Sequence, residues 1–133
     1  MMTRVVYAIT GIALLAAASA ALAGTEVFTV AGVPVTHVPD NATVVELDKP
    51  SRLDKQLSQG LPDKKDTAAR AVQKRLAGFK EAYGEAYSGL MRAWRLGVTK
   101  VPAVVVDGTY VVYGQPNVTA AVAEIRRAET REK

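Results

Sequence analysis

The segment 98–114, VTKVPAVVVDGTYVVYG, constrains the fold more than any other part of the chain. Pro102 opens a run of β-branched residues, an Asp-Gly pair at 107–108 interrupts it, and a second β-rich run follows. An Asp-Gly pair between two such runs is typical of a tight hairpin turn. We therefore predict two antiparallel strands, 103–107 and 109–113, with a proline at the entrance of the first.

Two further strands are predicted before this hairpin. The segments 25–30, TEVFTV, and 42–47, ATVVEL, are short, β-branched and bounded by turn-forming residues. The eleven residues between them, AGVPVTHVPDN, carry two prolines. A crossover between parallel strands needs about a dozen residues or more. Any helix in this crossover is therefore expected to be very short.

Helical patterns fill the region between the second strand and the hairpin. A polar helix begins near Lys49 and is stopped by GLPD at 60–63. A long helix follows and is predicted to end at Gly97. Its apolar residues recur at spacings of three and four, which predicts one buried stripe with Phe79 and Trp94 in the core. The stripe consists of Val72, Leu76, Phe79, Tyr83, Tyr87, Leu90 and Trp94.

Three glycines, Gly78, Gly84 and Gly89, lie inside the long helical pattern. Glycine within a helix costs about 1 kcal/mol relative to alanine. We therefore expect a bend near one of them, or close contact with a neighbouring element. After the hairpin, Asn117 is a favourable N-cap for a short amphipathic helix.

Residues 1–23 carry the pattern of a secretory signal peptide. A basic start is followed by an uncharged apolar stretch that ends in Ala-Leu-Ala, the small-x-small motif of a cleavage site. We expect cleavage before Gly24, export to the periplasm and one mature domain over 24–133 without stable membrane insertion. Because the apolar stretch is 19 residues long, an uncleaved N-terminal anchor is the alternative.

The residue inventory excludes several classes of function. The chain has no cysteine, and thiol–disulfide exchange requires a thiolate, so it is not a disulfide oxidoreductase or isomerase. The net charge of +4 is modest and mixed along the chain, which gives no argument for direct nucleic-acid binding. His37 is the only histidine, and no phosphate-binding loop or metal motif occurs. We therefore expect no enzymatic activity, no metal and no cofactor.

The segment 93–122, AWRLGVTKVPAVVVDGTYVVYGQPNVTAAV, together with the upstream EVFTV and VVELD, resembles a family of small exported proteins encoded in integrating conjugative elements. The activity of that family is unknown, and its members are assigned a thioredoxin-like fold. The likeness covers nearly all of the expected mature chain. It implies a cell-envelope component of a conjugative type IV secretion system, with other envelope proteins of the transfer apparatus as partners.

The resemblance implies an α/β, thioredoxin-like fold. Its small mixed sheet would have about four strands, with a long central helix, a C-terminal helix, and a first helix that is reduced or absent. In such folds the residue before a cis-proline pairs its backbone with an extended substrate, and these residues are here Val101 and Pro102. The segment 31–37 stands where redox relatives carry C-x-x-C. We therefore expect a redox-inactive protein-binding module whose peptide edge involves Lys100, Val101, Pro102 and His37.

Two alternatives remain open from the sequence. One is a small accessory envelope enzyme or chaperone with a site around His37 and Pro102. The other is a structural subunit that docks through the tyrosine- and tryptophan-bearing helix.

Overall fold

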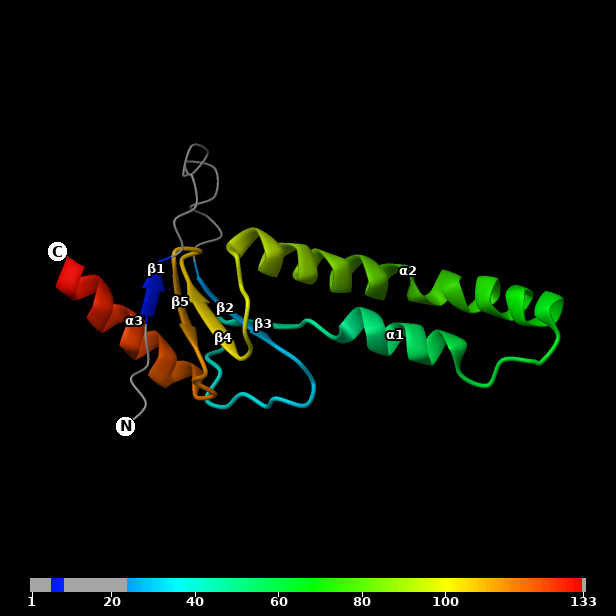
Figure 1. The fold of residues 1–133 in the computed structure, drawn as a ribbon, viewed down its shortest axis with the longest axis horizontal. Helices are drawn as coiled ribbons and strands as arrows, with labels where there is room; N and C mark the ends of the chain where they lie inside the picture. The colour runs from blue at the N-terminus through cyan, green and yellow to red at the C-terminus, as the bar shows by residue number, and fades with distance from the viewer. Residues whose placement is uncertain (1–5, 9–23, 133) are drawn as a thin grey trace.

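The computed structural model describes residues 6–8 and 24–132, which form three helices and one five-stranded mixed sheet (Figure 1). In chain order the elements are β1 (Val6–Ala8), β2 (Thr25–Thr29), β3 (Thr43–Glu46), α1 (Lys49–Ser58), α2 (Lys65–Leu96), β4 (Ala103–Val106), β5 (Tyr110–Tyr113) and α3 (Val118–Glu132). Within these ranges, none of the helices combines the length and apolar character that crossing a bilayer requires.

The sheet has the strand order β1-β5-β4-β2-β3. β2 and β3 are parallel, β4 is antiparallel to β2, and β5 is antiparallel to β4. The strands β2 to β5 therefore lie side by side in the order β5-β4-β2-β3, and only β4 runs opposite to the other three. This arrangement, with α2 and α3 on opposite faces, confirms the predicted thioredoxin-like α/β fold.

The fifth strand, β1, comes from the segment interpreted as a signal peptide. Val6 pairs with Val112 of β5 in an antiparallel ladder and packs against the cluster beneath α3. About four strands were predicted, so β1 is an addition to the expected sheet. An edge strand such as β5 presents unpaired N–H and C=O groups to any extended segment within reach. The rest of the expected signal peptide, 1–5 and 9–23, lies outside the described residues.

The core consists of two clusters, one on each face of the sheet. Alternate residues of β4 point to opposite faces, and all four are buried. Under α3 the buried cluster is Val27, Val104, Val106, Val112, Val118, Ala121 and Ile125. Under α2 it is Phe28, Ala93, Leu96, Ala103, Val105 and Val111. The sheet is therefore covered on both sides, which explains the continuous valine run of β4.

Only the C-terminal part of α2 lies against the sheet, and the rest extends beyond it beside α1 (Figure 1). Small residues make the contact: Ala86 and Ala93 are buried, and a Cβ built on Gly89 would lie 2.6 Å from Val45 Cγ1. This is the close contact expected for one of the three helical glycines. The Arg92 guanidinium donates two hydrogen bonds of 2.9 Å to the Glu26 carboxylate, which raise the pKa of Arg92 and tie α2 to β2.

The prediction that the aromatic stripe of α2 is core was wrong. Trp94 is 74% exposed and Tyr87 is 50% exposed, while Phe79 is half-buried. The sheet packs on the small-residue face of the helix, because small side chains let the helix backbone approach the strands closely. The aromatic residues lie on a neighbouring face. The predicted helix end at Gly97 is confirmed by its left-handed conformation, with φ 71°.

Candidate functional site

Four connecting segments meet at one end of the sheet. β2, β3 and β5 run in one direction and β4 in the other. The segments that follow β2, β3 and β5 therefore gather with the segment that precedes β4. In Figure 1 the loop after β2 and the β5–α3 connection lie together at the lower end of the sheet. The predicted site residues Lys100, Val101, Pro102 and His37 all belong to these segments.

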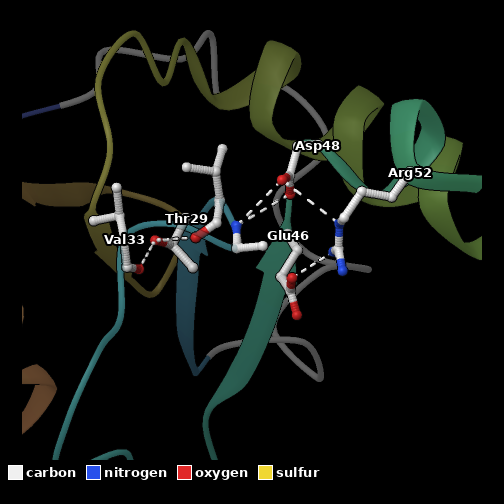
Figure 2. Close-up of polar contacts among 7 residues, drawn as sticks. Thr29, Val33, Glu46, Asp48 and Arg52 are labelled. Carbon is white, nitrogen blue, oxygen red and sulfur yellow. Dashed lines mark hydrogen bonds and ion pairs between the residues drawn. The ribbon is translucent and has the colours of Figure 1, made fainter. Parts of the chain in front are cut away.

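The turn after β2 occupies the place of the first helix, which is absent as predicted. Val33 N–H donates to the carbonyl of Val30 at 2.9 Å, and Thr29 Oγ1 donates to the carbonyl of Val33 at 2.6 Å. The Asp48 carboxylate accepts the N–H of Ala31, with N···O distances of 3.2 and 3.3 Å (Figure 2). These contacts close the turn on itself and tie it, through Asp48, to the segment that follows β3.

Asp48 is held in turn by Arg52, one turn along α1. Arg52 Nε lies 3.5 Å from Asp48 Oδ2, and its Nη2 donates to the Glu46 carboxylate (Figure 2). Asp48 directly precedes the helix predicted to begin near Lys49, a position at which aspartate usually caps the helix. It stands at the N-cap of α1 but makes no side-chain cap bond, because its carboxylate is used by Ala31 and Arg52. No local pattern predicts this link, since Asp48 and Ala31 are 17 residues apart.

His37 is attached to α3 through its backbone, and its imidazole contacts the neighbouring Thr36. Thr119 Oγ1 donates to the carbonyl of His37 at 2.8 Å. Its neighbour Thr36 bridges to the start of α3, donating to the carbonyl of Pro116 and accepting from the N–H of Val118. The exposed imidazole has Nδ1 3.2 Å from Thr36 Oγ1, and the residue adopts a left-handed φ of 51°. The loop is therefore attached to α3 while the ring faces solvent.

The peptide bond between Val101 and Pro102 is cis. Pro102 is buried and its carbonyl accepts the N–H of Gly114 at 2.9 Å. Val101 is half-buried and Lys100 is exposed. Among the described residues, neither the N–H nor the C=O of Val101 has a hydrogen-bond partner. Both backbone polar groups of Val101 are therefore unpaired within the part of the chain that the structure describes.

The predicted site residues come together only in part. Lys100, Val101 and Pro102 are consecutive, whereas no hydrogen bond or ion pair within the described residues joins His37 to them. Pro102 contacts the β5–α3 connection through Gly114, whereas His37 is bonded to Thr119 in the first turn of α3. In the part of the chain that the structure describes, no three acidic or histidine side chains gather as metal ligands.

The fold and this closed turn define a thioredoxin-like protein with a structural segment in place of the thiol site. The chain belongs to the family described as a protein of unknown function, DUF1525, whose model matches residues 22–131. No curated protein and no solved structure matches the chain.

Proposed function

We propose that this protein is a redox-inactive periplasmic component of a conjugative type IV secretion system, where it binds other envelope proteins during assembly. The proposal is supported by the resemblance of 93–122 to proteins of integrating conjugative elements and by the signal-like pattern of 1–23. The absence of cysteine removes the chemistry for which this end of the sheet serves in redox relatives.

The unpaired backbone of Val101 is the observation that carries the binding role. An extended segment of a partner can pair its main chain with Val101, as in other cases of strand addition. Lys100 is the next residue along the chain, and the segment 33–37 lies at the same end of the sheet, so both are candidates to supply side chains for specificity. Thr29 and Asp48 already provide hydrogen-bond partners for backbone groups of the turn after β2. The turn therefore does not compete for the N–H and C=O of Val101.

An accessory envelope enzyme or chaperone is the second candidate, favoured by one feature of His37. A non-glycine residue with positive φ is uncommon, and such conformations cluster at functional sites. In this alternative the exposed imidazole acts on a substrate held at the Val101 edge.

A mating assay in cells that carry the encoding element tests both candidates. Val101→Pro removes the backbone N–H donor, and we expect it to lower transfer frequency by about two- to tenfold, the effect of losing about one net hydrogen bond to a partner. His37→Ala and Lys55→Glu, an exposed α1 control, should transfer normally. Each variant is first checked for export and for an unchanged circular dichroism spectrum. Loss with His37→Ala alone favours the enzyme, and normal transfer with both variants contradicts a role for this end of the sheet.

A further inference from the structure

Among the described residues, most of the exposed large apolar side chains lie on α2. Seven large hydrophobic side chains are exposed among the described residues, and five of them are on this helix. These five are Leu76, Tyr87, Leu90, Met91 and Trp94. Isolated exposed apolar residues are ordinary, but a contiguous set on one element marks an interaction site.

The spacing of these residues is that of a helix-packing seam. Leu76, Tyr83 and Leu90 repeat every seven residues, and so do Lys80, Tyr87 and Trp94, offset by four. Alternating steps of four and three are the pattern of the two core positions of a coiled coil. We call these six residues the α2 seam. Its regular repeat matches another α-helix, because a helix presents side chains at the same interval.

Two side chains of the α2 seam, Tyr83 and Tyr87, are already held in place by contacts within the protein. Tyr83 donates a 2.7 Å hydrogen bond to Asp54 of α1, which raises the pKa of Tyr83 to about 12 and keeps it neutral. The Tyr83 and Tyr87 rings stack with centroids 6.3 Å apart. Side chains that are already oriented lose less entropy on binding.

A hollow beside the seam lets a second helix come close. It is lined by Gly84, Tyr87, Ser88, Met91 and Arg95. Gly84 and Ser88 are small and lie one turn apart, so a bulky side chain of a docked helix can enter between Tyr87 and Met91. Small residues at such positions permit close approach of two helices.

The charges of the surface indicate what kind of helix docks there. Lys80 is the only charged residue of the seam; Glu81 and Arg95, each one position after a seam residue, lie at its border, so the net charge of the surface is positive. A second copy of this chain fits poorly. The antiparallel register that places Leu76 against Trp94 also places Lys80 against Leu90, and the seam contains no carboxylate. A charge buried without a counter-charge is strongly unfavourable.

We propose that the α2 seam binds an amphipathic α-helix of a partner protein, with an apolar heptad face flanked by acidic residues. The apolar face of the partner helix covers Tyr87, Leu90 and Trp94, and the partner's carboxylates pair with Lys80 and Arg95. This surface is separate from the Val101 edge, so the inference does not depend on the binding mode proposed for that edge.

Trp94 is the only tryptophan of the chain and reports directly on the seam. The probe is a synthetic four-heptad peptide with leucine at both core positions, glutamate at the flanking positions and no aromatic residue. Added to the full chain, it should shift Trp94 emission to shorter wavelength in a saturable titration. A peptide with lysine in place of glutamate should bind at least tenfold more weakly. A shuffled peptide of the same composition should give no shift.

Variants of α2 test the assignment residue by residue. Tyr87→Glu should weaken peptide binding at least tenfold, with a thermal midpoint close to wild type because the residue is 50% exposed. Glu85→Gln, an exposed change on the same helix but off the seam, should leave binding unchanged. Lys80→Glu should reverse the preference and favour the lysine peptide.

Four outcomes would overturn the proposal. They are no shift with the acidic peptide, an equal shift with the shuffled peptide, a shift caused by raising the protein concentration alone, and a shift with phosphatidylglycerol vesicles but not with peptide. The third outcome assigns the seam to a second copy and the fourth to a lipid surface. None of these results bears on the Val101 edge, so failure here is distinguishable from failure of the proposed function.

Discussion

At the scale of the single residue, Trp94 shows how far burial can depart from residue type. Truncation of a buried tryptophan costs about 3–5 kcal/mol, and the sequence pattern predicted such a cost. With the side chain 74% exposed, we expect Trp94→Ala to change the free energy of unfolding by no more than about 0.5 kcal/mol. Urea denaturation followed by circular dichroism measures the difference.

Phe28→Ala provides the matched comparison, because Phe28 is fully buried beneath α2. We expect it to lose about 3–5 kcal/mol in the same assay. A loss of that size in Trp94→Ala would instead mean that the ring packs against the protein in solution.

At the scale of the element, the position of α2 on the sheet depends on one missing side chain. Replacing a mid-helix glycine by alanine normally stabilises a protein by about 1 kcal/mol. At Gly89 the new Cβ would lie 2.6 Å from Val45 Cγ1, and a valine side chain on a strand has little freedom to move away. We expect Gly89→Ala to destabilise the protein by about 1–3 kcal/mol, measured by urea denaturation.

Gly78→Ala is the control on the same helix, since nothing lies within 4 Å of its Cβ position. It should stabilise the protein by about 1 kcal/mol. Adding Val45→Ala to Gly89→Ala should recover part of the loss. Equal stabilisation by both glycine substitutions would show that α2 does not rest on β3 at this point.

Local signals predicted the elements better than their packing. The Asp-Gly turn and the β-branched runs determine the hairpin, so β4 and β5 lie within a residue or two of their predicted ends. The apolar spacing of α2 correctly predicted a long helix ending at Gly97. It gave the wrong buried face, because periodicity alone does not distinguish an apolar face that covers a sheet from one that stays exposed.

The candidate site was predictable only where it rests on contiguous residues. The positions of Val101 and Pro102 followed from resemblance, and the peptide bond between them is cis. The contact of Asp48 with Ala31 and the attachment of His37 to Thr119 join residues 17 and 82 positions apart. Such pairs are set by the fold as a whole and leave no mark in the local sequence.

At the scale of the whole molecule, the N-terminal strand separates the full chain from the expected mature form. Both core clusters are built from residues 27–125, so a chain that begins at Gly24 should keep its helices and strands. It lacks β1, and the β5 backbone groups that pair with Val6–Ala8 lose their partners. We expect faster amide hydrogen exchange in 110–113 of the shorter chain, measured by mass spectrometry.

The inner strand β4, paired on both sides in either form, serves as the internal reference and should keep its protection. Unchanged exchange in β5 would indicate that β1 does not pair with it in solution.

Because α2 is anchored to the sheet only near its C-terminal end, a small change of its angle moves its other end by a larger distance. Its first buried residue is Ala86, 21 positions after the helix begins at Lys65, so about 30 Å of helix lies on the far side of the sheet contact. A tilt of about 10° at that contact moves the distant end by about 5 Å. A small shift of α2 against Val45 therefore produces a larger displacement at the start of the helix, near Lys65, than at the sheet contact itself.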